Sequence, residues 1–119
     1  MLTNDHALII EEEVLLALDI EDILARHGLA DIRYYRSVAE ATPHFAELST
    51  FGLAVIEAKL GAADVVAFSE RLAKAGVALV VMSADQTAAD FFPHAVPLDK
   101  PFDAAGLLAA CDAARARAS

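Results

Sequence analysis

The feature that most constrains the fold is an alternation of short apolar runs with segments of helical periodicity. The runs His6–Ile10, Leu53–Ile56 and Val77–Met82 are almost continuously apolar, and each ends at polar residues. Runs of this length predict strands buried on both faces, as in a parallel sheet. Asp31–Arg36 is more polar and Ala95–Leu98 contains a proline, so these two runs are interpreted as edge strands.

Segments with helical spacing lie between these runs. The first follows Glu11-Glu12-Glu13, which we expect at the strand end and in the first helical turn, and Gly28 ends it. The second opens with a capping box, Ser37-Val38-Ala39-Glu40, and Pro43 should kink it. Further helices are predicted over Asp64–Ala75, within Gln86–Phe92 and after the capping residue Asp103. Five alternations predict one α/β domain over residues 1–119, with helices on both faces of a parallel sheet.

Composition narrows the possible partners. The net charge of −9 argues against nucleic acid, whose phosphates require Lys and Arg. No apolar run approaches the roughly 20 residues of a membrane span. The first residues do not resemble a signal peptide. The single cysteine, Cys111, cannot form an internal disulfide and fits a reducing compartment. We therefore expect a cytoplasmic protein with neither nucleic-acid nor membrane partners.

Polar side chains collect where the predicted strands end. Since the carboxyl ends of parallel strands meet at one edge of a sheet, these side chains should lie close together. The strands deliver, in chain order, Glu11 and Glu12, then Glu57, then Ser83, and finally Lys100. Three carboxylates, a hydroxyl and an ammonium suit phosphoryl chemistry. A carboxylate can attack phosphorus, a cation held by oxygens can neutralise charge, and Ser and Lys can bind phosphoryl oxygens.

In this order the motifs resemble the response-regulator receiver domain of two-component signalling. The matching stretches are ALIIEEE, LAVIEAKLG, VVMSAD and LDKPF, and the resemblance covers nearly the whole chain. The resemblance implies a flavodoxin-like (βα)5 three-layer sandwich with the strand order 2-1-3-4-5. It also implies a non-enzymatic signalling module. In the family, a histidine kinase or histidine phosphotransfer protein phosphorylates an aspartate with the help of magnesium.

Carried over by position, the resemblance gives each polar residue a role. These are the phospho-acceptor position Glu57, the acidic pair Glu11 and Glu12, the switch hydroxyl Ser83 and the pocket lysine Lys100. The metal ligands that the resemblance implies are then Glu11, Glu12 and Glu57. The Lys100–Pro101 bond is expected to be cis, as in typical members of the family.

The departures from the family pattern fall on the chemistry. The family acceptor is aspartate, and the extra methylene of Glu57 moves the carboxylate by ~1.5 Å. A misplacement of ~1 Å can cost on the order of 100-fold in a positioned reaction. Glu12 is also longer than the usual aspartate, although magnesium requires near-ideal octahedral geometry. Lys59 stands where the family lends a backbone carbonyl to the metal, and Pro97 occupies the aromatic switch position.

These departures lead to the hypothesis of a pseudo-receiver whose pocket is closed by internal salt bridges, with at most weak Mg²⁺ binding. Lys59 and Lys100 would supply the positive charge, and Glu57 would reach toward Ser83 and Lys100 in partial imitation of a phosphoaspartate. The protein would act in a bacterial cytoplasm through contact with a histidine kinase, a phosphotransfer protein or another signalling protein. The expected contact surfaces are the first helix and the face formed by residues 86–92, the fifth strand and the last helix. A homodimer could form through the second surface.

Three alternatives stay open. A phosphorylation-competent single-domain regulator would use Mg²⁺ and Glu57. A small metal-dependent phosphohydrolase would use the same carboxylates, but the sequence offers no other general acid or base. A flavodoxin-like nucleotide or flavin binder would need a Gly-rich loop after Ile10, and the sequence lacks one.

Overall fold

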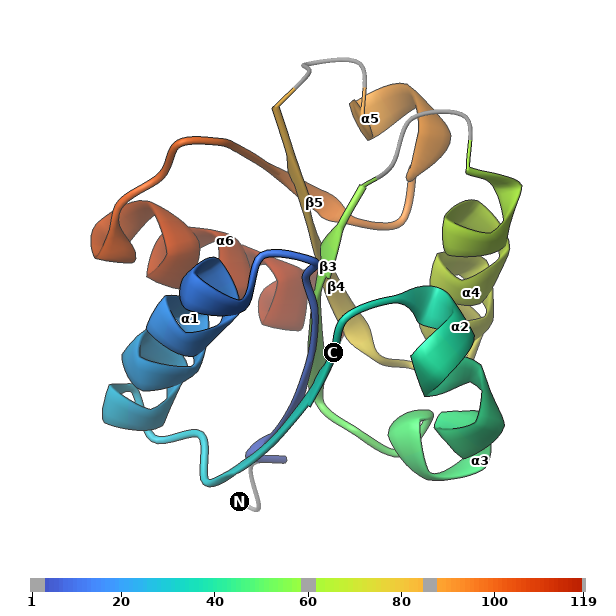
Figure 1. The fold of residues 1–119 in the computed structure, drawn as a ribbon, viewed down its shortest axis with the longest axis horizontal. Helices are drawn as coiled ribbons and strands as arrows, with labels where there is room; N and C mark the ends of the chain where they lie inside the picture. Colours follow the sequence, from blue (N-terminus) through green and yellow to red (C-terminus); the bar gives the residue numbers. More distant parts are fainter. Residues whose placement is uncertain (1–3, 59–61, 85–87, 119) are drawn as a thin grey trace.

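The computed structural model describes residues 4–58, 62–84 and 88–118. They form one parallel sheet of five strands in the order β2-β1-β3-β4-β5 (Figure 1). The strands are β1 (His6–Ile10), β2 (Asp31–Tyr35), β3 (Leu53–Glu57), β4 (Ala78–Ser83) and β5 (Val96–Asp99). The predicted α/β class, the strand order and the two edge strands are confirmed.

Helices cover both faces of the sheet. They are α1 (Val14–Arg26), α2 (Val38–Ala41), the 3₁₀ turn η1 (Thr42–His44), α3 (Phe45–Leu48), α4 (Ala63–Lys74), α5 (Ala88–Phe91) and α6 (Ala104–Ala118). Figure 1 shows α1 and α6 on one side of the sheet and α2, α3 and α4 on the other. Within the described residues, none of the helices has both the length and the hydropathy that a membrane span requires.

Each face of the sheet has its own apolar core. Leu8 and Ile56 face α2–α4 and pack with Phe68, whereas Ile9 and Val55 face α1 and α6. Successive side chains of a strand point to opposite faces, so a strand covered on both sides must be apolar at every position. This requirement accounts for the continuous apolar runs in the sequence.

Cys111 belongs to the core between the sheet and α6, as its place on an apolar helical stripe predicts. Desolvation by burial, together with the charge of Asp112, raises the pKa of the Cys111 thiol to about 12. The thiol is therefore protonated and unreactive at neutral pH, because the thiolate is the nucleophilic form.

The second helical segment is broken in the way its proline predicts. Pro43 lies in η1, which separates α2 from α3. The Ser37 hydroxyl oxygen accepts the Glu40 amide at 3.2 Å, as in a capping box. However, the Glu40 carboxylate accepts the amide of Arg36 at 3.1 Å instead of the Ser37 amide. Only one half of the predicted capping box is therefore formed.

The start of α1 corrects the sequence-based prediction. The run Glu11-Glu12-Glu13 was expected to extend into the first helical turn. However, α1 begins at Val14, and Glu13 is its N-cap residue with extended backbone. Glu11 is instead fully buried at the sheet edge. The backbone must leave the sheet before it can coil, so residues 11–13 form the connection between β1 and α1.

Helix α1 offers a matched test of the packing. Leu24 is completely buried against the sheet, whereas Leu15 on the same helix is 84% exposed. We expect Leu24→Ala to lower the free energy of unfolding by about 2–5 kcal/mol. Leu15→Ala should change it by less than about 0.5 kcal/mol, because it removes no buried contact. Urea unfolding followed by circular dichroism measures both, and equal losses would contradict the packing described above.

Candidate functional site

An ammonium group lies between two carboxylates at the carboxyl edge of the sheet. Lys100 Nζ donates to Glu11 Oε1 at 2.8 Å and to Glu57 Oε2 at 3.0 Å. Glu11 directly follows β1, Glu57 ends β3 and Lys100 follows β5. Since β4 separates β3 from β5, the lysine side chain spans one intervening strand to reach both partners. The predicted meeting of strands β1, β3 and β5 at this edge is thus observed.

Glu11 is the buried anchor of the site. Its side chain has no exposed surface, and its second oxygen, Oε2, accepts the Glu13 amide at 2.9 Å. Its carbonyl oxygen accepts the Tyr34 hydroxyl at 2.7 Å, and its amide donates to the Tyr35 carbonyl at 3.2 Å. A buried charge is tolerated only when it is paired and hydrogen-bonded, and Glu11 meets both conditions.

Glu57 is only partly enclosed, with 20% of its side chain exposed. Its Oε2 faces Lys100, and its Oε1 accepts the backbone amide of Glu12 at 3.4 Å. Residue Glu12 itself is exposed. Of the predicted acidic pair, Glu11 therefore brings a carboxylate to the lysine, whereas Glu12 contacts Glu57 through its backbone.

Ser83 and Pro101 adjoin Lys100 through the backbone. Ser83 is buried at the end of β4, and its carbonyl oxygen accepts the Lys100 amide at 2.8 Å. The Lys100–Pro101 peptide bond is cis, as the resemblance implied. Lys59, the second lysine proposed for the pocket, lies outside the described residues.

The electrostatics favour a charged lysine. Desolvation by itself lowers the pKa of Lys100, but hydrogen bonds and charge interactions with Glu11 and Glu57 act in the opposite direction. The net result is a pKa of Lys100 above its ordinary value. Lys100 is therefore an ammonium ion throughout the neutral range and donates to both carboxylates.

The arrangement does not fit a magnesium ion between Glu11 and Glu57. Each of their four carboxylate oxygens already accepts a protein N–H, from Lys100, Glu12 or Glu13. Magnesium needs several oxygens at near-ideal octahedral positions, and here the ammonium occupies the place between the carboxylates. In the part of the chain that the structure describes, no three His, Cys, Asp or Glu side chains are grouped to hold a metal.

Two hollows adjoin the site. A cleft of about 400 Å³ is lined by Glu13, Leu16, Ala84, Lys100, Pro101 and Phe102. A cavity of about 70 Å³ lies beside Glu57, bounded by Ile10, Arg36, Ser37, Val38, Asp64 and Val65. The smaller cavity has room for one or two waters, because a water occupies about 30 Å³ in the liquid. The larger cleft opens beside the lysine and the start of α1.

Two contacts of the site were not identified from the sequence. The Tyr34 hydroxyl and the Glu13 amide both bind Glu11, one at its carbonyl and one at its carboxylate. The signal for Tyr34 was its place in β2, since the parallel register pairs it with Ile9, two residues before Glu11. No sequence pattern indicates which amide of a connection turns toward a carboxylate.

Solved structures show the same fold, whereas no protein-family model and no curated protein matches the sequence. A response regulator receiver protein from Sinorhizobium medicae matches with a TM-score of 0.81 at 19% identity, covering 96% of each chain. SdrG from Pseudomonas melonis in a BeF3-activated conformation matches with a TM-score of 0.74 at 24% identity, covering 97% of this chain and 99% of that one. A putative pilus assembly-related protein from Burkholderia pseudomallei matches with a TM-score of 0.76 at 19% identity, over 100% and 96% of the two chains. The chain thus has the fold of receiver domains.

Removing the ammonium tests the site. Lys100→Met leaves the buried Glu11 charge unpaired, so the free energy of unfolding should fall by about 3–5 kcal/mol at pH 7. The control Arg26→Met breaks the exposed pair of Arg26 with Asp22 and should cost at most about 1 kcal/mol. Urea unfolding of both variants measures the difference, and equal costs would contradict the buried pairing.

The pH dependence gives a second readout of the same variant. Because the pKa of Lys100 is raised in the folded protein, its stabilising contribution is complete below the unfolded pKa of about 10.4. The contribution is lost as the pH rises through the folded pKa. The stability gap between the wild type and Lys100→Met should therefore narrow above about pH 10.4. A gap independent of pH in this range would show that the ammonium charge is not what stabilises the site.

Proposed function

We propose that this chain is an atypical receiver, or pseudo-receiver, that acts by protein–protein contact without being phosphorylated. The observation that carries the proposal is the position of Lys100 Nζ between Glu11 and Glu57. Hydrogen bonds to a carboxylate oxygen, above all from an ammonium, stabilise its charge and lower its nucleophilicity. Both oxygens of Glu57 accept protein N–H groups, one of them from an ammonium. In this proposal Glu57 keeps the place of a phospho-acceptor but serves as an ion-pair partner.

Charge balance supports a function without magnesium. Glu11 and Glu57 contribute two negative charges. Lys100 contributes one positive charge, 2.8 Å from the Glu11 carboxylate and 3.0 Å from the Glu57 carboxylate. We propose that Lys59 supplies the second positive charge, as the sequence suggested. Since the metal would have to displace an ammonium from a buried carboxylate, the proposal includes at most weak Mg²⁺ binding.

One observation favours a second candidate, a slowly phosphorylated single-domain regulator that uses Mg²⁺ and Glu57. Glu57 retains 20% exposure beside the small cavity, so solvent reaches part of its side chain. Against this candidate, Glu57 Oε2 already accepts Lys100 Nζ at 3.0 Å, so the ammonium competes with a metal for this oxygen. The described geometry therefore favours the pseudo-receiver.

A phosphodonor experiment separates the two candidates. The protein is incubated with acetyl phosphate and Mg²⁺, and its intact mass is measured for the wild type, Glu57→Gln and Glu57→Asp. For a pseudo-receiver we expect no stoichiometric phosphoryl adduct on the wild type. The Glu57 oxygens accept hydrogen bonds from Lys100 and Glu12, and they lie one methylene farther from the backbone than those of an aspartate. A full adduct on the wild type that disappears in Glu57→Gln would establish the phosphorylated regulator instead.

Helix α1 presents the proposed contact surface. Val14, Leu15 and Leu18 are exposed by 45%, 84% and 52%, and they follow directly after the site. Leu16 and Phe102 line the adjoining cleft. Grouped exposed apolar side chains on a soluble domain mark interaction surfaces. We propose that this surface receives a histidine kinase, a histidine phosphotransfer protein or another signalling protein in a bacterial cytoplasm.

Substitutions on α1 test the contact surface. The double variant Leu15→Ser/Leu18→Ser should weaken binding to a histidine phosphotransfer protein or kinase of the same organism by at least about tenfold, which is ~1.4 kcal/mol. Glu57→Gln should bind like the wild type if signalling does not require phosphorylation. Calorimetric titration of each variant measures the affinities. Unchanged binding of the double variant would remove α1 from the proposal.

Phe91→Ser is the matched control on another surface. Phe91 is 46% exposed on α5, within the α5-β5-α6 face proposed for a homodimer. The Phe91→Ser substitution should leave partner binding unchanged but shift the mass measured by light scattering toward that of the monomer. An equal mass for the wild type and Phe91→Ser would argue against dimerisation through this face.

A further inference from the structure

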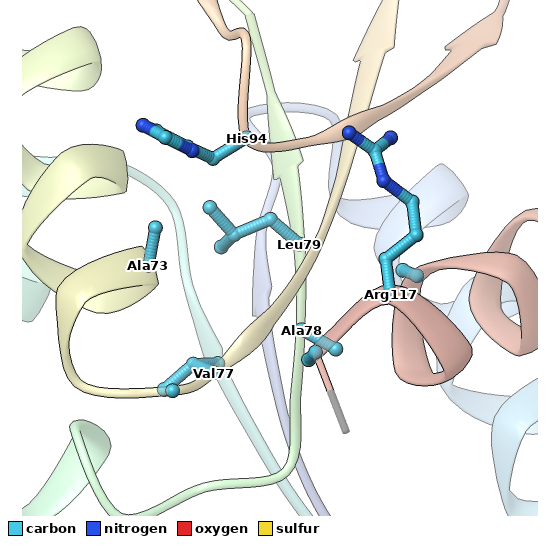
Figure 2. A pocket seen from close by; sticks show the side chains of 9 residues that line it. Ala73, Val77, Ala78, Leu79, His94 and Arg117 are labelled. Carbon is cyan, nitrogen blue, oxygen red and sulfur yellow. The ribbon is translucent and has the colours of Figure 1, made fainter.

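A cavity lies at the opposite edge of the sheet from Lys100, where β4 and β5 begin. Its volume is about 270 Å³. It is lined by Ala73, Gly76, Val77, Ala78, Leu79, His94, Ala114, Arg117 and Ala118. In the view of Figure 2, Leu79 lies between the side chains of His94 and Arg117, with Ala73 and Val77 to one side. The cavity therefore has a mainly polar accessible surface, to which His94 and Arg117 contribute, with small aliphatic side chains among its lining residues.

The chain around this cavity contains no carboxylate side chain. The segments 71–84, 91–98 and 113–118 include no Asp or Glu, although the whole chain has 18. Their charged residues are all basic: Arg71, Lys74, Arg115 and Arg117. In a chain with a net charge of −9, the lack of carboxylate side chains in these segments lowers the repulsion that an anion meets at the cavity.

Two of these basic residues are held by other contacts, Lys74 is exposed on α4, and Arg117 lines the cavity. Arg71 stacks over the Phe45 ring at 3.8 Å, and Arg115 donates to the Asn4 carbonyl at 2.6 Å. Lys74 is exposed in the last turn of α4, next to the lining residue Ala73. Arg117 lines the cavity itself.

Arg117 is held in place by the chain that precedes β5. Its Nη1 donates to the Ala95 carbonyl at 3.3 Å and its Nη2 to the Pro93 carbonyl at 3.5 Å. A guanidinium has five N–H donors, so these two bonds leave further donors for a ligand. The same turn carries His94, which brings a second nitrogen donor to the rim.

The backbone adds a donor at the floor. Ala78 N–H donates to Gly52 O on the β3 side, and successive amides of a strand point to opposite sides, so Leu79 N–H points toward the β5 side. The β4–β5 pairing begins only at Val80 and Val96. This register places Ala95, the residue before β5, opposite Leu79, so the Leu79 amide points toward the turn that carries His94 at the rim of the cavity.

Two helix ends near the cavity oppose an anion, but the side-chain charges are larger. The C-termini of α4 and α6 each carry about half a negative charge. At α4, amides of residues 75–77 already bind carbonyls of its last turn, which weakens that end. Lys74 in the last turn of α4 offsets the charge of that helix end. Arg117 carries a full positive charge at the cavity itself, so the balance there remains positive.

We propose that this cavity binds a small organic carboxylate. Its acid group would accept hydrogen bonds from Arg117, His94 and the Leu79 amide, and its compact apolar part would lie on Ala73 and Val77. The volume is slightly below the 300–1,000 Å³ of typical ligand pockets, so the ligand is small. A bare ion would leave most of the 270 Å³ to water, which favours a ligand with a short organic body. The site is independent of the function proposed for Glu57.

Amide chemical shifts in ¹H–¹⁵N spectra test the proposal, with sodium benzoate as the probe at constant pH and ionic strength. Saturable shifts are expected at Gly76, Leu79 and Ala114, without matching shifts at Glu57 or Lys100. Benzamide, which has the same shape without the charge, should bind at least about tenfold more weakly. Inorganic phosphate should also bind more weakly, because it lacks the apolar body.

Variants of the cavity make the test specific. Arg117→Gln should weaken benzoate binding by about tenfold, whereas Arg26→Gln, which removes an equal charge from the exposed surface of α1, should not. Because Arg117 also braces the turn before β5, Ala73→Leu serves as a second variant that narrows the cavity without removing a charge. The absence of saturable shifts, equal binding of benzamide, tighter binding of phosphate, or full retention of binding in both cavity variants would each overturn the proposal.

Discussion

Glu11 is a carboxylate without exposed surface, and the carboxyl edge of the sheet is arranged to keep it charged. Burying an isolated charge costs several kcal/mol, so the site must provide a counter-charge and hydrogen-bond donors. Lys100 and the Glu13 amide provide them. They come from the connections that follow β5 and β1, and Lys100 also holds Glu57 at the end of β3. The two ion pairs of Lys100 thus hold together three segments that are distant in the sequence.

The contact with Lys100 has two effects on Glu57: it stabilises the carboxylate, and it makes the carboxylate less reactive. An ammonium at 3.0 Å stabilises the charge of the carboxylate and thereby lowers the nucleophilicity of its oxygen. Glu57 contacts Lys100 through Oε2 while its Oε1 accepts the Glu12 amide. The geometry therefore accounts for a site that keeps its charges in the absence of a metal, which is the basis of the proposed phosphorylation-independent function.

The surroundings of Lys100 and those of the cavity differ in charge. Carboxylates gather around Lys100 at one edge, whereas the chain around the cavity at the other edge carries only basic charges. Strand β4 links them, since it begins at the cavity with Ala78 and ends beside Lys100 with Ser83. The proposed partner surface on α1 and the proposed ligand cavity are therefore separate, and each can be altered without changing the other.

The sequence by itself determined the strand and helix alternation, the burial of the central strands, the edge positions of β2 and β5, and the meeting of Glu11, Glu57 and Lys100. These features follow from local periodicity and from the shared edge of parallel strands. Only the tertiary structure decided that Glu11 is the buried member of the acidic pair and that Glu12 contributes an amide. It also decided that the β4–β5 pairing begins at Val80 and Val96. Such choices depend on side-chain orientation and strand register, which are set when distant segments pack, because a buried charge must find its donors there.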